Sequence, residues 1–436
     1  MFLCGTLIAV AVRGLLADHH IFKFPVVASI LAIVWIVPKG IELESNALST
    51  AHLEGFWYYV AICFFAIFLG FSIGEARSSN PASNSKPRTK LRYPDYSETK
   101  LITCSAVMFV FGFISWLLIR GVDTSGMGAG WTGVITMYAL FSSATSLSLC
   151  LGMIIFTKTR NWIALTIAVA SAIPIVLTVA TGVRREALFD LVLLTAGSYY
   201  LTRGISPPKI AVVAALLIGS VVLNKVGDFR SYVDSGQGNL IDALLTKEMY
   251  DFDPFQIEQG EANEVGLAVA DYHYINSNGD LEYGADYANS IVSQYVPAFL
   301  VGRDFKNSLM FPTLSQRASA NNTEIAFSMG STRTGFSDTY RSFGWLGFIV
   351  FGAISYLFGH LYGRAKLGSI KERYLYLVLL GSGLKSITHS TPEFLASLPF
   401  VLVISFLVFS YSKVRRRSTK RILPRVKYGK ERAMGK

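Results

Sequence analysis

The sequence contains few cysteines and few charges, and it lacks the motifs that identify nucleotide-driven proteins. Its four cysteines (Cys4, Cys63, Cys104 and Cys150) lie in hydrophobic stretches without a CxxC spacing, so they predict neither a disulfide framework nor a zinc site. No Walker A loop, Rossmann fingerprint or serine elbow is present, which leaves ATP-driven transport and hydride transfer without support. Nor is there a repeat of helices with matched glycine or proline breaks, which is typical of secondary transporters.

Apolar sequence is what the chain has in abundance. Of its 436 residues, 52% are hydrophobic and only 16% are charged, which is too apolar for an ordinary soluble protein. Only helices and closed barrels satisfy the backbone in lipid, and these apolar runs are too long for barrel strands. The sequence therefore predicts an all-α polytopic membrane protein. About eleven transmembrane helices are expected, at residues 2–17, 24–37 (ended by Pro38), 56–73, 101–119, 131–156, 162–180, 188–201, 210–223, 343–362, 374–385 and 394–411.

Charge is divided unevenly between the connections. The segment 225–341 holds 16 of the 29 acidic residues but only 8 of the 40 lysines and arginines. Basic residues gather in the connectors 77–100, 158–160, 203–209 and 364–373 and in the C-terminal tail. With the tail in the cytoplasm, alternation of the helices places all of these inside, as the positive-inside rule requires, and places 225–341 outside. The net charge of +11 is then a topology signal near anionic lipid, and no groove-reading motif accompanies it, so no nucleic-acid partner is expected.

These boundaries divide the chain into four parts. They are an N-terminal bundle of eight helices (1–224), a large external loop between helices 8 and 9 (225–341), three C-terminal helices (342–412) and a basic cytoplasmic tail (413–436).

The motif TGVRRE at 181–186 is the sharpest local signal for a site. Arg184 and Arg185 are expected in a short external turn, where the positive-inside rule disfavours cations. Two arginines in such a turn indicate a specific interaction with an anion. Guanidinium groups suit phosphate and diphosphate oxygens, and this predicts anion binding. The alternative is ion pairing with the acidic loop or with neighbouring carboxylates. Asp190 follows Glu186 by one helical turn, which would place both carboxylates on one face.

Three further features belong to the external side. The aromatic stretch 283–300 predicts either an amphipathic helix in the membrane interface, ended at Pro297, or the core of a small external domain. The Gly- and hydroxyl-rich stretch 330–347 carries Arg333, Asp338 and Arg341 into a helix, as a polar ligand site or as a solvated helix entry. His389 is a candidate general base, although an isolated histidine is more often structural.

Three segments together resemble the bacterial oligosaccharide repeat unit polymerases, the Wzy-type O-antigen polymerases. They are TGVRRE, LEYGADYANSIVSQYVPAFL (281–300) in the large loop, and GFSDTYRSFGWLG (335–347) before a late helix. The resemblance covers roughly residues 160–412. Members of the family commonly have Gly-Glu before the tyrosine of the late motif, where this chain has Asp338-Thr339-Tyr340.

The resemblance implies a GT-C-like glycosyltransferase of the bacterial inner membrane, working at its periplasmic face. Such an enzyme joins undecaprenyl-diphosphate-linked oligosaccharides among membrane lipids, without metal or other cofactor, and a chain-length regulator protein is a possible partner. Arg184, Arg185, Arg333 and Arg341 would then bind the substrate diphosphate, and Glu186, Asp338 and His389 are the catalytic candidates. An O-antigen ligase or a lipid-linked oligosaccharide flippase remains an alternative, although charges crowded at one face favour the polymerase over a transporter.

Overall fold

The computed structural model describes residues 2–17, 20–45, 50–79, 95–122, 134–182, 185–205, 264–314, 316 and 333–414. Throughout these ranges the secondary structure is helical, and the single β-bridge among them joins Tyr96 to Lys413. The helices of the first half are α1 (Phe2–Leu16), α2 (Phe24–Leu31), a π-helix (Ala32–Ile36), α3 (Val37–Ser45), α4 (Thr50–Ser79), α5 (Glu98–Arg120), α6 (Val134–Ser142), α7 (Ala144–Thr159), α8 (Trp162–Gly182) and α9 (Arg185–Arg203). Those of the second half are α12 (Glu264–Asn278), α13 (Ala285–Tyr295), α14 (Ala298–Val301), α15 (Arg303–Ser308), α17 (Gly335–Phe343), a 3₁₀ turn (Gly344–Gly347), α18 (Phe348–Lys366), α19 (Ile370–Thr388) and α20 (Thr391–Ser412).

The chain is a multi-pass helical membrane protein. Within the described residues, seven helical segments are long and apolar enough to cross a bilayer: Phe24–Ile41, His52–Ser78, Glu98–Arg120, Val134–Thr159, Trp162–Val179, Gly335–Lys366 and Thr391–Ser412. The predicted helices at 2–17, 188–201 and 374–385 coincide with α1, α9 and α19, which are shorter or carry more charge. The predicted helix at 210–223 and the tail from 415 onward lie outside the described residues. The total of eleven therefore stays a prediction.

Pro38 does not end the second helix, contrary to the sequence-based prediction. The helix widens into the π-helix Ala32–Ile36, in which the Val37 N–H donates to the Ala32 carbonyl, and then continues as α3 to Ser45. A wider turn just before a proline relieves the clash of its ring with the preceding turn, so the helix continues through it.

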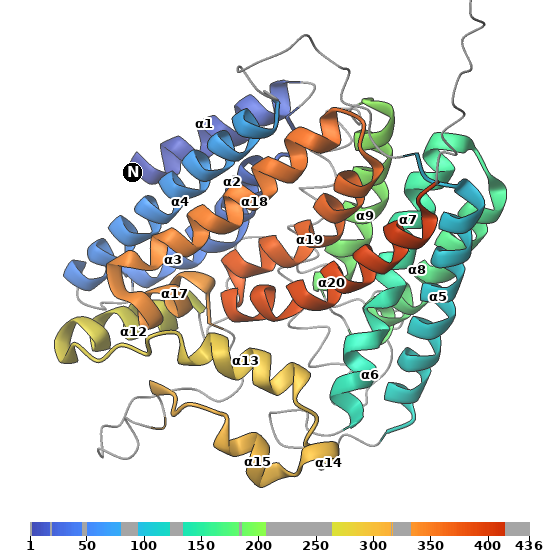
Figure 1. Ribbon diagram of the computed structural model, residues 1–436. Helices are drawn as coiled ribbons and strands as arrows, with labels where there is room; N and C mark the ends of the chain where they lie inside the picture. The colour runs from blue at the N-terminus through green and yellow to red at the C-terminus, as the bar shows by residue number, and fades with distance from the viewer. Residues whose placement is uncertain are drawn as a thin grey trace, which may run out of the picture.

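The pair α4 and α18 packs side by side along its whole length (Figure 1). Glycines make this close approach possible: a Cβ on Gly70 would lie 2.3 Å from the Gly352 carbonyl oxygen, and one on Gly359 would lie 2.2 Å from that of Phe71. Helices in lipid associate through such small-residue contacts, because apolar side chains gain nothing by leaving lipid. The Ser355 hydroxyl also donates to the Ile67 carbonyl at 2.6 Å and adds a bond across the contact.

A second group of helices packs around α7, which contacts α5, α8 and α9. Buried serines link three of these helices: Ser105 and Ser148 lie 3.1 Å apart, and the Ser171 hydroxyl donates to that of Ser148 at 2.9 Å. Hydroxyl groups between membrane helices fix their rotation, because an unpaired polar group in hydrocarbon is costly.

The basic connectors meet at one end of the bundle. The Ser97 N–H donates to the Ser412 carbonyl at 2.9 Å, the Thr159 hydroxyl donates to Glu98 at 3.0 Å, and Lys366 lies 3.8 Å from Glu75. The described edges of the connectors 77–100, 158–160 and 364–373 therefore share a side with the start of the tail, as the charge pattern predicts.

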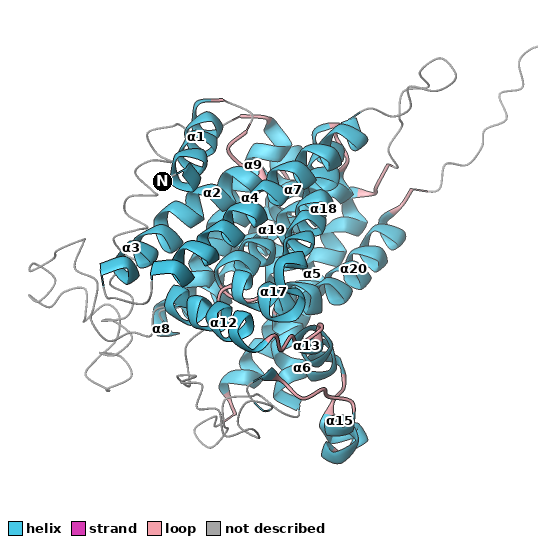
Figure 2. Cartoon of the chain, turned by 90° about the vertical axis from the view of Figure 1, so that its left-hand side faces the viewer, coloured by secondary structure: helices cyan, strands magenta, loops and turns pink. Residues whose placement is uncertain are grey.

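The helices of the acidic segment gather at the opposite end. Both views place α12, α13 and α15 below the bundle, with α17 between them and α18 (Figures 1 and 2). Four aromatic rings, those of Tyr59, Tyr272, Tyr340 and Trp345, pack on one another and join α4, α12 and α17. Helix α17 crosses the predicted boundary at 341 and connects the acidic segment directly to the membrane helices.

Candidate functional site

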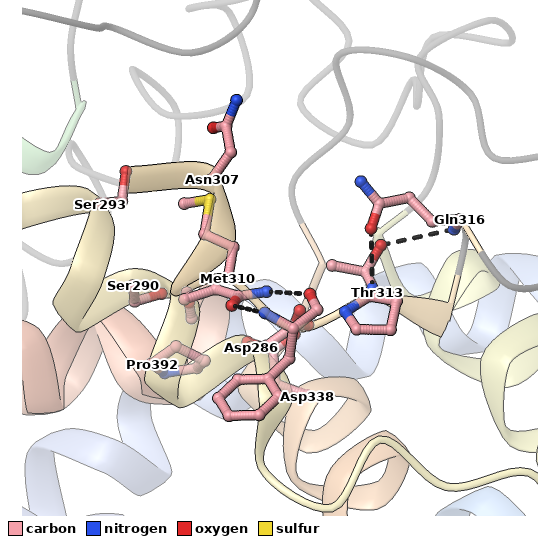
Figure 3. Close-up of a pocket in the computed structure, with 13 residues that line it drawn as sticks. Asp286, Ser290, Ser293, Asn307, Met310, Thr313, Gln316, Asp338 and Pro392 are labelled. Carbon is pink, nitrogen blue, oxygen red and sulfur yellow. Dashed lines mark hydrogen bonds between the residues drawn. The ribbon is translucent and has the colours of Figure 1, made fainter. Parts of the chain in front are cut away.

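A cavity of about 730 Å³, lined by both polar and apolar side chains, opens beside α13, at the end of the bundle that carries the acidic segment. One wall is the face of α13 that carries Asp286, Asn289, Ser290 and Ser293, whose spacing places them along one stripe of a helix. The segment after α15 and the first residues of α20 form the rest, and Asp338 of α17 lies in the wall (Figure 3). The complete lining is Asp286, Asn289, Ser290, Ser293, Asn307, Met310, Phe311, Pro312, Thr313, Gln316, Asp338, Ser390 and Pro392.

The wall opposite α13 is held in place by side-chain bonds to its backbone. The Asn289 amide pairs with both backbone groups of Phe311: its Nδ2 donates to the Phe311 carbonyl at 2.9 Å, and its Oδ1 accepts from the Phe311 N–H at 2.8 Å. The Thr313 N–H donates to Gln316 Oε1 at 3.0 Å (Figure 3). An irregular segment needs such partners for its backbone, and here they give the cavity a defined shape.

Asp338 belongs to a buried group of charged residues that we call the Arg341 cluster. Its members are Glu282, Asp286, Asp338 and Arg341. The guanidinium of Arg341, with 1% of its side chain exposed, donates from Nη2 to Glu282 and lies 3.5 Å from Asp286 Oδ2. Asp338 precedes Arg341 by three residues on the same helix, and spacing of this kind brings opposite charges together. A buried arginine must be paired, so the cluster fixes α17 against the start of α13.

Glu282 links the Arg341 cluster to the cavity wall. Its carboxylate accepts a hydrogen bond from the Leu314 N–H at 2.8 Å, and its own N–H donates to the Arg341 carbonyl at 2.9 Å. Burial raises the pKa of Glu282 to about 7, with Arg341 acting against this rise and Asp286 adding to it. Two atoms of the cluster, Glu282 Oε2 and Arg341 Nε, are buried without a hydrogen-bond partner in the described chain. Incomplete pairing of this kind is unusual for a purely structural ion pair.

Asp271 of α12 connects a second arginine to the same region. The Ser337 hydroxyl donates to Asp271, and Arg333 Nε lies 3.1 Å from Asp271 Oδ2. Arg333 is therefore linked through Asp271 to Ser337, the residue before Asp338 of the Arg341 cluster.

A second charged group, the Lys385 cluster (Glu186, Asp190, Lys385 and His389), joins the start of α9 to the end of α19. The Lys385 ammonium lies 2.8 Å from Glu186 Oε2 and 3.6 Å from Asp190 Oδ2, and His389 Nε2 lies 3.5 Å from Glu186 Oε1. Gly381 makes room for Asp190, because a Cβ there would lie 2.0 Å from Asp190 Oδ1. Charges between membrane helices are expensive unless paired, and they mark functional positions in membrane proteins.

The turn from α19 to α20 joins the Lys385 cluster to the cavity wall. The Thr388 hydroxyl lies 2.7 Å from His389 Nδ1, and Ser390, the next residue, lines the cavity. Gly335, at the start of α17, packs so closely on α19 that a Cβ would lie 1.7 Å from the Ser386 carbonyl oxygen. The Lys385 cluster is therefore joined to the cavity wall through this turn, and the carboxylates that line the cavity itself are Asp286 and Asp338.

Most of the predicted site residues fall into these two groups. Glu186 and His389 meet in the Lys385 cluster, whereas Asp338 and Arg341 meet in the Arg341 cluster, with Arg333 beside them through Asp271. Arg184 and the side chain of Arg185 lie outside the described part of the structure, although α9 begins at Arg185.

Sequence reasoning missed three of the charged residues. Lys385 is a cation on the external side at the end of an apolar helix, so the argument used for TGVRRE applied to it equally. Glu282 and Asp286 are carboxylates four residues apart at the start of a predicted helix, a spacing that favours a common partner.

Among the described residues, no group of three or more histidine, cysteine, aspartate or glutamate side chains is arranged to hold a metal ion. The chain matches no protein-family model, no curated protein and no solved structure.

Proposed function

We propose that this protein is a membrane glycosyltransferase that polymerises oligosaccharide repeat units carried on a lipid diphosphate, undecaprenyl diphosphate in a bacterial inner membrane. The observation that carries the proposal is the place of Asp338, a member of the Arg341 cluster, in the wall of a cavity at one end of a membrane bundle, where the Lys385 cluster ends one residue before the lining residue Ser390. A cavity of this size accommodates a ligand of several rings, and its amide and hydroxyl groups suit the hydroxyls of sugars.

The reaction requires one bond to form and one to break. The acceptor sugar hydroxyl attacks the anomeric carbon of the donor, the bond from that carbon to the diphosphate oxygen breaks, and the lipid diphosphate leaves with the electron pair. Two carboxylates, Asp286 and Asp338, line the cavity and belong to the Arg341 cluster. Asp338 is the proposed base that takes the hydroxyl proton, because Asp286 is the one that pairs with Arg341. Arg341 is the proposed positioning residue, since its guanidinium is buried and holds Glu282 and Asp286.

The leaving diphosphate needs positive charge. Lys385 and His389 both contact Glu186 at the end of α19, and the Lys385 carbonyl accepts from the N–H of the cavity residue Ser390 at 3.2 Å. Lys385 is the proposed cation that exchanges a carboxylate partner for phosphate. Arg184 and Arg185 precede Glu186 in sequence and are the proposed further contacts to the diphosphate. The external position of this end of the bundle, the periplasm in a bacterium, belongs to the same proposal.

Glycan chain length in a strain lacking the gene tests the proposal. We expect the deletion strain to carry surface glycan of a single repeat unit, because single units can still be ligated when polymerisation is lost. Gel analysis of the extracted glycan measures this. Complete loss of surface glycan would instead favour a ligase or a flippase, and an unchanged ladder would reject all three.

Complementation with variants tests the residues. Asp338→Asn and Lys385→Met should each lower polymerisation by roughly 10-fold or more, since each 1.4 kcal/mol of lost transition-state stabilisation is a factor of ten. Asp304→Asn on the exposed face of α15 and Lys371→Met at the other end of α19 are matched controls that should restore the ladder. Full activity of Asp338→Asn at matched protein level would show that Asp338 is not the base.

A further inference from the structure

Helix α13 is attached to a membrane-spanning helix at a point where that helix is interrupted. Pro399 lies inside α20, and the Tyr295 hydroxyl donates to the Ala396 carbonyl at 2.6 Å while accepting from the Phe400 N–H at 3.2 Å. In a regular helix those two backbone groups would bond to each other, so the tyrosine hydroxyl is inserted into one turn of α20. Side chains are one of the groups that fill this role in membrane helices bent at proline.

This contact fixes the depth of α13. The helix α20 has 22 residues, and at about 1.5 Å per residue it is about 33 Å long, little more than the roughly 30 Å of a hydrocarbon core. Ala396 and Phe400 lie about 8 Å and about 14 Å along α20 from Thr391 by the same rise. The Tyr287 hydroxyl lies 2.6 Å from that of Thr391 itself. Helix α13 therefore runs alongside the first turns of α20, and its last residue reaches below the membrane surface.

The chain that follows Tyr295 is apolar and uncovered. None of the four residues of α14 is buried: Phe299 is 49% exposed and Leu300 is 71% exposed. Phe305 of α15 is 54% exposed. A cluster of large apolar side chains on a surface marks an interaction site. Arg303, exposed at the start of α15, supplies a positive charge beside this cluster.

We propose that α14 and α15 form an interfacial lipid anchor, in which Phe299, Leu300 and Phe305 insert into the acyl chains of the leaflet on the cavity side and Arg303 contacts lipid phosphate. The partner is bilayer lipid because Tyr295, three residues before α14, is bonded to a helix turn inside the bilayer. Amphipathic segments of this kind sit about 5–10 Å into the boundary between headgroups and acyl chains. This agrees with the depth of Tyr295.

The anchor has a consequence for the cavity, because the same segments form both. The polar stripe of α13 faces the cavity, whereas Ile291 on another side of the same helix is 43% exposed. Phe311, 57% exposed, lies in the cavity lining just after α15. The anchor thus places the cavity at the lipid surface. A polar group attached to a lipid tail could enter the cavity there while its tail stays in the leaflet. The anchor rests on geometry alone and does not depend on the proposed glycosyl transfer.

Spin labels at three positions test the anchor in the full-length protein, in vesicles of phosphatidylethanolamine and phosphatidylglycerol. The four native cysteines are replaced by alanine, and one cysteine is introduced by Leu300→Cys, Ser277→Cys or Val403→Cys. Ser277 is an exposed residue on α12 and serves as the reference for water, whereas Val403, 57% exposed near the middle of α20, serves as the reference for lipid.

Collision rates with oxygen, which concentrates in lipid, and with a water-soluble nickel chelate are compared. At Leu300 we expect the ratio of oxygen to nickel collisions to be several-fold above that at Ser277 and below that at Val403. A ratio equal to that at Ser277 would place the segment in water and overturn the proposal. Shielding from both reagents would indicate a protein contact and would also overturn it.

A second measurement avoids the cysteine-free background. Leu300→Trp in the otherwise native chain should add fluorescence that lipids brominated near the start of the acyl chain quench, compared with the native protein in the same vesicles. Ser277→Trp is the matched control and should add fluorescence without extra quenching. Equal quenching of the two variants would contradict the anchor.

Discussion

At the scale of single residues, the unusual property of this protein is the burial of paired charges at one end of a membrane bundle. Arg341 has 1% of its side chain exposed, and its partner Glu282 has none. Replacing such a pair with apolar residues often leaves stability unchanged, so burial of ions is weak evidence for a stabilising role. Their position beside the cavity argues instead that they set the charge and shape of a site.

The raised pKa of Glu282 predicts a pH-dependent stability. Because the folded-state pKa is about 7 and the ordinary value is 4.5, the folded protein holds this proton more tightly. This contribution is complete below the ordinary value and is lost as the pH rises through about 7. We expect the thermal unfolding temperature in detergent to fall as the pH rises from about 4.5 to about 7, and the fall to be smaller in Glu282→Gln. Asp304→Asn is the control and should keep the native pH profile; an identical profile for Glu282→Gln would assign the dependence to another group.

At the scale of elements, two kinds of contact hold the helices in register. The pair α4 and α18 relies on glycines that bring backbones together, whereas α13 relies on two tyrosine hydroxyls that bond to α20. The glycine contacts need small residues on both helices. The tyrosine contacts need a hydroxyl group placed beside polar groups of α20. Both kinds of contact are favoured in lipid, because close packing stabilises helix pairs there and an unpaired polar group is costly.

The close packing predicts a contrast between two alanine substitutions on α18. In Gly359→Ala the new Cβ would lie 2.2 Å from the Phe71 carbonyl oxygen, so the two helices must separate, whereas in Gly352→Ala its nearest neighbour is the Ala66 Cβ at 3.7 Å. Overpacking of this kind costs about 1–3 kcal/mol. We expect Gly359→Ala to unfold at clearly lower temperature than the native protein and Gly352→Ala to unfold near it. Equal unfolding temperatures for the two variants would show that α4 and α18 adjust without cost.

At the scale of the whole molecule, the two ends of the bundle differ in charge and in structure. One end gathers basic connectors, and the other gathers α12, α13, α15 and the cavity (Figure 2). The positive-inside rule then assigns the first end to the cytoplasm.

Reporter fusions test this orientation. Alkaline phosphatase, which is active only outside the cytoplasm, should be active when fused after Gly279, at the end of α12, and inactive when fused after Lys420 in the basic tail. Gly279 has open space around it, so an insertion there should be tolerated. The reverse pattern would invert the orientation and move the cavity to the cytoplasmic side.

The sequence by itself determined that the chain is a helical membrane protein, where most of its helices lie and which connectors share an end. Hydropathy and charge act on each helix separately, through its transfer into lipid and through the placement of its flanking lysines and arginines, so they can be read in a short window. The end of α13 before Pro297 was predicted in the same way, because proline stops a helix locally.

Only the tertiary structure decided which charges meet. Glu186 faces Lys385 and His389 across two helices, and Arg341 faces Glu282 although 59 residues separate them. These contacts depend on the rotation of each helix about its axis and on the depth at which each is packed. Both are set by glycine contacts and by hydroxyl bonds between distant segments. No local window of sequence contains that information, because these partners are distant from one another in sequence.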